Sequence, residues 1–420
     1  MFTINAYHNP YLRVGQNAMQ VILSLGVDAA AQVGRAPLAL GIALDRSGSM
    51  EGPKMRAARD GAVRVVQSLD ESIMFMVVVF NDNARVVFGP APGTAENKRQ
   101  AAAAIQTVQA ANGTRMSTAL NTIIDKFGQD RARATKILFL TDGRNETEHR
   151  SQLDRAVERC RAANISINAW GVGTDWDVAE LRHMAEATYG TADIIPTPQQ
   201  ISTAFAESFN QIRKTALTNV RLSLWSPVGV SLKSIAQVYP TIVPLGMETD
   251  PANPRQQIIS LGSFAAGEQR DYLVDLNVPV YAPGQQFLML RPAVKYYSAG
   301  TTEVEEKSTR DGWVFVQWTE NMALASQIEQ HIAHYTNQEE LAQYIREGQD
   351  ALAAGDSARA TRLLGQALDI SQRSGNERIT RLLSEIVQRN PDGTVCLNQR
   401  ADAVARKTLA INVGHTTKLK

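Results

Sequence analysis

The sequence predicts a multidomain chain that combines a doubly wound α/β domain, a β-sandwich and a C-terminal helical region. Three observations support this prediction. Strand-like apolar runs alternate with helical patterns over residues 36–214, short β-rich runs between Pro- and Gly-bearing loops fill 215–319, and helical spacing dominates 320–390. The 420 residues also exceed the usual size of one domain, so two or three domains are expected.

Residues 1–35 are expected to supply strands to the β-sandwich. From Leu12 to Val27 the chain alternates in the manner of a strand, and this segment ends before the first strand of the α/β domain begins. We therefore expect the α/β domain to be inserted in a loop between two strands of the sandwich.

The α/β domain is predicted over residues 36–214. Its strands are predicted at 37–44, 74–80, 85–88, 136–140, 165–171 and 192–195. Its helices are predicted near 53–69, 95–110, 115–127, 149–163, 177–188 and 198–214. Strands and helices alternate, which is the order that a parallel sheet with helical crossovers requires.

An Asp-x-Ser-x-Ser sequence directly follows the first of these strands. The strand is apolar on both faces and would deliver Asp45 to the C-terminal edge of the sheet, where open α/β folds bind their ligands. Asp45, Ser47 and Ser49 place one carboxylate and two hydroxyls at alternate positions, a set of oxygens that suits a hard cation such as Mg²⁺. Taken alone, the loop fits an ordinary strand-to-helix turn capped by Asp45 about equally well.

Two later segments bring further oxygen ligands to the same edge. Thr114 lies in a Gly-marked loop before a helical pattern, and Asp142 directly follows a second buried strand. These residues can therefore converge with the first loop above one sheet. Two carboxylates and three hydroxyls leave at least one coordination position of a dication to water or to a visiting ligand, and a carboxylate from another protein is the natural visitor.

With these three motifs in order, residues 36–214 resemble a von Willebrand factor A-type (VWA) domain. The metal-ion-dependent adhesion site of that family has the pattern Asp-x-Ser-x-Ser, then Thr, then Asp, and the chain has the family's residue types at all five positions. The resemblance implies bound Mg²⁺, with Mn²⁺ or Ca²⁺ as alternatives, and a protein partner whose acidic residue completes the coordination. We therefore expect a protein-binding module of the bacterial intracellular type that acts as an adaptor, assembly factor or signalling scaffold and is not an enzyme.

Two other functions stay open. The same site would dock an AAA-type ATPase if the chain were an accessory subunit of a chelatase-like complex, or it would activate water if the chain were a metallohydrolase. Hydrolysis needs a general base, and the nearest His in sequence is His149, which is expected on the solvent face of the next helix. The run from Gly171 to Thr174 resembles part of a nucleotide loop, but no Lys follows, which disfavours nucleotide binding.

The composition limits the classes of partner and compartment. Lys and Arg total 43 against 42 Asp and Glu, and this balance offers no overall field for nucleic acid or a membrane surface. No stretch is long and apolar enough to span a bilayer, and residues 1–10 lack the basic and apolar regions of a signal peptide. Cys160 and Cys396 are expected to be free thiols in a reducing compartment. We therefore expect a cytoplasmic protein.

Beyond residue 320 the pattern is helical. The run Thr336–Glu339 has the form of a capping box that starts a helix, and two Gly-containing turns, at Gly355 and Gly375, separate further helices. Residues 347–374 resemble one tetratricopeptide helix pair, and a single repeat is too short for a stable array. A helical hairpin packed on the sandwich is favoured over a dedicated peptide groove.

Residues 391–420 are predicted to form a flexible tail, because they are basic and show little periodicity after Leu409. A sharper hypothesis is that Thr416 and Thr417 are phosphorylated and are then bound by a forkhead-associated domain.

Overall fold

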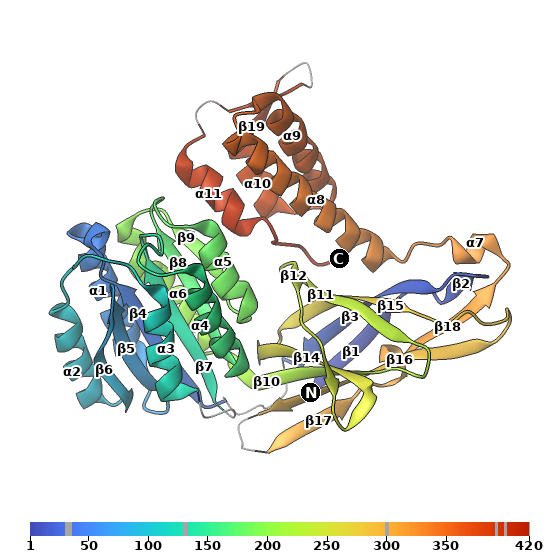
Figure 1. The fold of residues 1–420 in the computed structure, drawn as a ribbon, viewed down its shortest axis with the longest axis horizontal. Helices are drawn as coiled ribbons and strands as arrows, with labels where there is room; N and C mark the ends of the chain where they lie inside the picture. The colour runs from blue at the N-terminus through green and yellow to red at the C-terminus, as the bar shows by residue number, and fades with distance from the viewer. Residues whose placement is uncertain (30–35, 129–132, 299–301, 391–393, 399–400, 420) are drawn as a thin grey trace.

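The structure is a computed structural model that describes residues 1–29, 36–128, 133–298, 302–390, 394–398 and 401–419. It has three parts (Figure 1): an α/β domain, a β-sandwich beside it, and a helical region above both. The chain begins in the sandwich, crosses to the α/β domain, returns to the sandwich and ends in the helical region.

The α/β domain is built on a six-stranded sheet in the order β6-β5-β4-β7-β8-β9. The strands are β4 (Leu38–Asp45), β5 (Met74–Phe80), β6 (Ala84–Pro92), β7 (Ala134–Thr141), β8 (Ile165–Val172) and β9 (Ala192–Ile195). Every pair is parallel except β5 and β6, which are antiparallel. Every residue of the two central strands, β4 and β7, is buried, which explains the apolar runs at residues 38–44 in β4 and 137–140 in β7.

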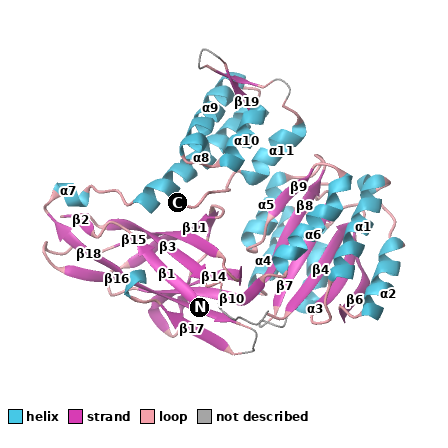
Figure 2. Cartoon of the chain, turned by 180° about the vertical axis from the view of Figure 1, so that it is seen from behind, coloured by secondary structure: helices cyan, strands magenta, loops and turns pink. Residues whose placement is uncertain are grey.

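Helices cover both faces of this sheet (Figure 2). On one face α1 (Pro53–Ser68), α2 (Ala95–Gln106) and α6 (Ile201–Ile212) share a hydrophobic core with the sheet. On the other face α3 (Met116–Phe127), α4 (Arg150–Ala162) and α5 (Val178–Ala187) form a second core. The predicted doubly wound α/β fold is confirmed, with a mixed sheet because of the antiparallel edge strand β6.

The sandwich consists of two mainly antiparallel sheets, and Phe264, Tyr296 and Trp318 lie in the core between them. One sheet has the order β1-β3-β15-β11-β12, and the other has β13-β14-β10-β16-β18-β2 with β17 beside β16. The strands before the α/β domain are β1 (Phe2–Tyr7), β2 (Tyr11–Arg13) and β3 (Ala18–Val27). Those after it are β10 (Thr215–Trp225), β11 (Ser231–Tyr239), β12 (Val243–Pro244), β13 (Glu248–Asp250), β14 (Asn253–Ala265), β15 (Gln269–Asn277), β16 (Gln286–Tyr297), β17 (Glu303–Lys307) and β18 (Val314–Thr319).

Strands from the two ends of this region pair directly with one another. β3 pairs with β15 along nine residues, from Ala18 to Gly26, and β2 pairs with β18. The α/β domain therefore lies, in sequence, between two strands of the sandwich, β3 and β10.

The helical region contains α7 (Met322–Ala325), α8 (Gln330–Ala353), α9 (Ser357–Arg373) and α10 (Glu377–Ile386). Asp356 and Asn376 cap α9 and α10 through their side chains. The helix start expected at Thr336 is wrong, because α8 continues through it and the Thr336 hydroxyl donates to Ile332 O within the helix. Tyr335 lies on the inner face of α8 and packs against the sandwich, so packing determines the course of the chain here.

The flexible tail expected over residues 391–420 is also wrong for the described residues. They include β20 (Val395–Leu397), which pairs with β19 (Val387–Arg389), and the helix α11 (Ala403–Asn412). α11 has two buried faces: Leu409 joins the core of the helical region, and Ile411 joins the core of the α/β domain. A helix that is buried on two sides lacks the single apolar stripe that marks a surface helix, which explains why the sequence shows little periodicity.

The structure bears on two further expectations, one about membrane-spanning segments and one about the cysteines. Among the residues that the structure describes, no helix is both long and apolar enough to cross a membrane. Cys160, buried in α4, and Cys396, in β20, are free thiols.

Candidate metal centre

The two predicted carboxylates meet at the C-terminal ends of neighbouring strands. Asp45 is the last residue of β4, and Asp142 follows β7 directly; the two strands are adjacent and parallel, with Leu44 opposite Leu140. Both aspartates are fully buried. The sheet therefore places two carboxylates side by side at one edge, where parallel α/β sheets bind ligands.

Asp45 is oriented by hydrogen bonds to both of its oxygens. The Ser47 amide donates to Oδ1 at 2.7 Å, and the Thr141 hydroxyl donates to Oδ2 at 2.5 Å. Burial, with a smaller contribution from the charge of Asp142, raises the pKa of Asp45 to about 6 against the lowering effect of these hydrogen bonds. The carboxylate is therefore held in place but pays a desolvation cost that a cation would relieve.

Asp142 accepts from the loop after β4 and from helix α1. Ser49 Oγ donates to its Oδ1 at 2.7 Å, Ser47 Oγ lies 3.5 Å from the same oxygen, and Lys54 forms an ion pair with Oδ2. The two serines lie on either side of Gly48, where a short 3₁₀ turn, Gly48–Met50, redirects the chain into α1. Ser47 is buried, whereas Ser49 is exposed, so the centre opens to solvent beside Ser49.

Thr114 completes the set from the loop before α3. Gly113 has φ +92°, a conformation that few other residues adopt, and it turns the chain so that Thr114 comes two residues before the helix. A Cβ atom placed on Gly143 would lie 3.6 Å from Ser49 Oγ, 3.6 Å from Thr114 Oγ1 and 4.0 Å from Ser47 Oγ. The three hydroxyls thus surround one small space, and the structure brings all five predicted residues together.

The donor set fits a hard divalent cation. Two carboxylates and three hydroxyls are the oxygen ligands that Mg²⁺, Mn²⁺ and Ca²⁺ prefer, and softer metals would favour thiolate or imidazole. Nowhere in the described part of the chain do three or more His, Cys, Asp or Glu side chains gather in a way that could hold a metal. A metal at this centre would therefore depend on serine and threonine hydroxyls as much as on carboxylates.

Two residues of the centre were not identified from the sequence. Thr141 precedes Asp142 and fixes Asp45 across the strand pair, and Lys54, in the first turn of α1, pairs with Asp142. A hydroxyl directly after the apolar run 137–140 was the available signal for Thr141. Nothing in the sequence marks Lys54, because its contact with Asp142 depends on how α1 leaves the loop.

Arg46, inside the first motif, connects the neighbouring loops. Its backbone N–H donates to Phe80 O, its carbonyl accepts from the Ala111 N–H, and its guanidinium donates to Asn81 Oδ1 at 3.1 Å. It therefore supports the loop geometry from behind.

A family model of the von Willebrand factor type A domain matches residues 38–194, the span that contains both aspartates and the three hydroxyls. The chain contains a VWA domain. VWA domains often mediate protein–protein interaction, and the family match supports this general role.

Relatives and solved structures agree with this assignment. An uncharacterized protein of Synechocystis is 26% identical over 261 residues, which are 60% of each protein, and human inter-alpha-trypsin inhibitor heavy chain H4 is 26% identical over 189 residues, 42% of this chain and 20% of that one. The matches thus span less than two thirds of either relative. A solved von Willebrand factor type A protein from Catenulispora acidiphila is 28% identical with a TM-score of 0.90, covering 100% of this chain and 97% of its own.

A more distant structure shows a likeness of fold alone. The ArnB paralog VWA2 from Sulfolobus acidocaldarius is 15% identical with a TM-score of 0.66, and the match covers 99% of this chain and 98% of that one.

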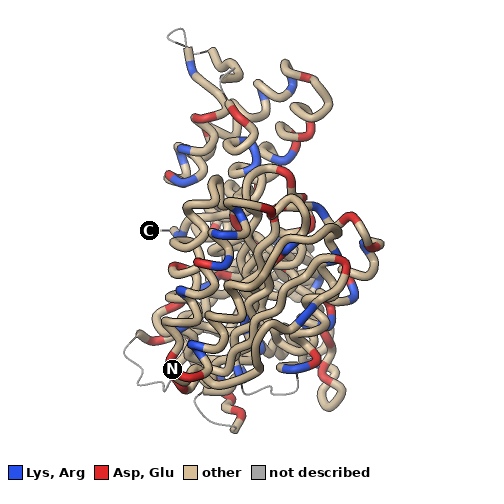
Figure 3. Tube along the Cα trace, turned by 90° about the vertical axis from the view of Figure 1, so that its left-hand side faces the viewer, with Lys and Arg blue, Asp and Glu red and all other residues tan. Residues whose placement is uncertain are grey.

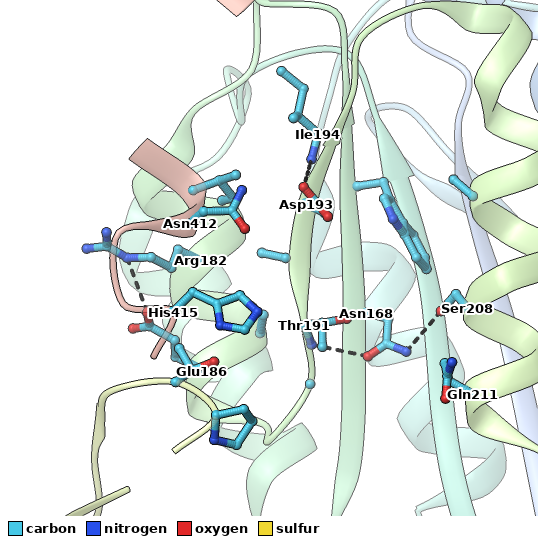
Figure 4. Close-up of a pocket in the computed structure, with 18 of the residues that line it drawn as sticks. Asn168, Arg182, Glu186, Thr191, Asp193, Ile194, Ser208, Gln211, Asn412 and His415 are labelled. Carbon is cyan, nitrogen blue, oxygen red and sulfur yellow. Dashed lines mark hydrogen bonds and ion pairs between the residues drawn. The ribbon is translucent and has the colours of Figure 1, made fainter. Parts of the chain in front are cut away.

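A larger cavity, of about 820 Å³, lies where the three parts of the molecule meet (Figure 4). Its charged lining residues largely pair with one another: Arg182 with Glu186 at 3.3 Å and Arg378 with Asp193 at 3.5 Å. The uncharged Asn168 likewise bonds to Thr191 and Ser208. The cavity is therefore a polar junction between domains. Its side chains do not converge on one point in the way that the five oxygen-bearing residues of the metal centre do.

Two other sequence hypotheses are not supported by the positions of their residues. Thr416 is buried and its hydroxyl donates to Val238 O at 2.6 Å, while the Thr417 hydroxyl accepts from Gln338 Nε2 at 2.7 Å, so neither is on an accessible tail as a kinase substrate would be. The ring of Trp176 occupies the space over Gly171, where a nucleotide loop would need room for phosphate, which agrees with the expectation against nucleotide binding.

Proposed function

We propose that the VWA domain is a metal-dependent protein-binding module. Asp45, Ser47, Ser49, Thr114 and Asp142 would hold Mg²⁺, or Mn²⁺ or Ca²⁺, and a carboxylate of a protein partner would complete the coordination. The observation that carries the proposal is the convergence of three hydroxyls and two buried carboxylates beside the exposed Ser49. When bound, the cation would supply an electrophilic position that attracts an anionic ligand.

The depth of the ligands supports docking of a partner side chain. The carboxylates are fully buried, so the chain itself shields them from solvent, whereas the open side faces outward at Gly48 and Ser49. Five oxygens from the chain leave room for at least one more ligand around a six-coordinate ion. An acidic side chain of a partner would approach the ion from this exposed side.

The surroundings favour binding over hydrolysis. The Glu148 carboxylate accepts from the Ser117 amide at 3.0 Å, in the first turn of α3, and also from the Ser117 hydroxyl. It therefore supports the helix start that positions Thr114. His149 is exposed and is the N-cap residue of α4, so it likewise belongs to a helix start. A metallohydrolase would need a base facing the open position.

The test is affinity capture from the native host with the full chain as bait, in Mg²⁺ and again with a chelator. Asp45→Asn is the variant, and Asp60→Asn on the exposed face of α1 is the matched control for the loss of one carboxylate. We expect partners that are retained by the wild type and Asp60→Asn in Mg²⁺ and lost with chelator or Asp45→Asn. Equal capture by Asp45→Asn, with its fold verified by circular dichroism, would contradict the proposal.

The same capture separates the classes of partner. An AAA-type ATPase in the Mg²⁺-dependent fraction would identify the chain as an accessory subunit of a motor complex, and an adaptor role would return other proteins. Either result requires the same centre.

A further inference from the structure

Lys54 contributes a positive charge to the centre that the five oxygen ligands do not explain. Its ammonium pairs with Asp142 Oδ2, while Ser49 takes Oδ1. The Asp142 side chain is fully buried, and the Lys54 side chain is 27% exposed. One partner of this ion pair is therefore fixed inside the domain, and the other reaches in from the surface.

The position of Lys54 in the helix is unfavourable for a cation. It is the second residue of α1, directly after Pro53, and the first turn of a helix carries a partial positive charge. The first turn of α1 has no acidic residue that would offset this charge. The attraction of the buried Asp142 is the interaction that holds the ammonium there.

The charges of the centre show what happens when a dication arrives. Asp45 and Asp142 together contribute two negative charges and Lys54 one positive charge. A dication would neutralise the two carboxylates alone, so an ammonium on the same carboxylate would then be repelled across a short distance. Both also compete for the same lone pairs of Asp142.

We infer that Lys54 is a built-in competitor for the metal: its ammonium occupies Asp142 in the metal-free protein and leaves when a divalent cation binds. This inference rests on the metal centre proposed above. The side chain can leave because it is long, flexible and partly exposed.

Two consequences follow by linkage. Without Lys54 the metal-free protein keeps a buried carboxylate with no cation beside it, so the metal-free fold is less stable. The same change removes the competitor, so metal binds more tightly. Lys54 thus lowers the metal affinity in exchange for a stable empty centre, and it sets the metal concentration at which the module becomes competent to bind.

Isothermal titration of the full chain with MgCl₂, and with MnCl₂ in parallel, tests this without any partner. We compare wild type, Lys54→Met, Lys54→Arg and Arg56→Met; Arg56 is exposed on the same turn of α1 and its variant loses the same charge. We expect Lys54→Met to bind metal roughly tenfold more tightly than wild type, with Arg56→Met within about twofold and Lys54→Arg close to wild type. Thermal unfolding of the same proteins should show a lower Tm for metal-free Lys54→Met and a larger rise on adding metal.

The outcomes separate this inference from the proposed function. If wild type and Lys54→Met bind metal equally, or if Lys54→Met binds more weakly, Lys54 is not a competitor and the inference fails while the metal centre stands. If no protein of the set binds either metal, the metal centre itself fails. If Lys54→Met proves too unstable to titrate, Lys54→Gln, which retains a polar side chain, gives the same comparison.

Discussion

The two ends of strand β7 both bury charged side chains, but they do so in opposite ways. At the C-terminal end, Asp142 lies beside an opening and is surrounded by hydroxyls and by the partly exposed ammonium of Lys54. At the N-terminal end, Lys136 is buried and donates to Ser166 Oγ at 3.0 Å, in the field of Arg270 and Glu268 of the sandwich. One end is the proposed metal site, and the other is a joint between domains.

On the sandwich side of this joint, Arg270 is held by several partners. Arg270 donates to Leu261 O at 2.8 Å, to Ser263 O at 2.6 Å and to Glu268 Oε1 at 2.6 Å, and its guanidinium lies 4.0 Å from the centre of the Phe264 ring. The Arg270 guanidinium thus has its partners within the sandwich. The comparison teaches that burial of charge alone does not mark a functional site, and that an opening together with replaceable partners does.

Charges of both signs are spread over the described part of the chain. Figure 3 shows blue and red segments interspersed along the trace, in keeping with the near balance of 43 basic and 42 acidic residues. The local arrangement at the end of β7 therefore carries the functional argument.

The largest expected effect concerns the joint. Arg270→Ala should lower the free energy of unfolding by about 3–5 kcal/mol, because it leaves two buried carbonyl groups without their donor and removes the ion pair with the partly exposed Glu268. Chemical denaturation measures this loss. The Mg²⁺ affinity of the folded fraction should not change, since the metal centre is about 20 Å away along β7. A change in metal affinity would mean that the two ends of the strand are coupled.

The next effect concerns the site. Asp142→Asn should weaken Mg²⁺ binding by about 100-fold, or about 2.7 kcal/mol, because a carboxylate ligand becomes a neutral amide of the same shape. Its free energy of unfolding should fall much less than that of Arg270→Ala. Titration calorimetry and chemical denaturation on the same samples give both values. If Asp142→Asn lowers the free energy of unfolding as much as Arg270→Ala does, the contrast drawn between the two ends of β7 is wrong.

Gly143→Ala tests the space between the hydroxyls with a smaller change. The added methyl would lie 3.6 Å from both Ser49 Oγ and Thr114 Oγ1, where it would crowd a bound ion and its water. We expect metal binding to weaken roughly tenfold, with Tm almost unchanged because these distances are ordinary van der Waals contacts. Unaltered affinity would show that the ion, if bound, lies outside this space.

The smallest effect is expected for Lys136→Met. Burial, and then the charge of Arg270, lower the pKa of Lys136 to about 8. The unfolded chain binds this proton more tightly, so the charged form penalises the fold below pH 8, and the penalty disappears as pH rises towards 10.5. Lys136→Met should therefore raise stability by about 1 kcal/mol at pH 7 and lose this advantage at high pH. Denaturation at pH 7 and pH 10 measures the difference; a variant less stable at both values would contradict the assignment.

The strands and the five proposed ligand residues could be predicted from the sequence because each is marked by residues close to it in the chain. β4 and β7 are buried on both faces and carry apolar runs, at residues 38–44 and 137–140, and the aspartates that follow these runs break the pattern visibly. Parallel neighbours bring such ends to one edge. Thr114 was found because Gly113 and a helical pattern flank it.

What could not be predicted depends on contacts between distant segments. Lys54 contacts Asp142 because of the direction in which α1 leaves its loop. Thr141 belongs to the centre because its hydroxyl donates to Asp45 on the neighbouring strand β4. α11 was missed because its two apolar faces pack on different domains. The Thr336 signal was a valid local motif, but the packing of Tyr335 against the sandwich outweighed it.

A crystal of the wild-type chain soaked in MnCl₂, with data collected at the manganese absorption edge, tests the metal centre most directly. The account predicts one strong anomalous peak among Asp45, Ser47, Ser49, Thr114 and Asp142, with oxygen ligands at roughly 2.1–2.2 Å and at least one position taken by solvent or by a neighbouring carboxylate. The Lys54 ammonium should have moved away from Asp142. A map with no peak at this edge of the sheet, while Lys54 still pairs with Asp142 at saturating Mn²⁺, would contradict it.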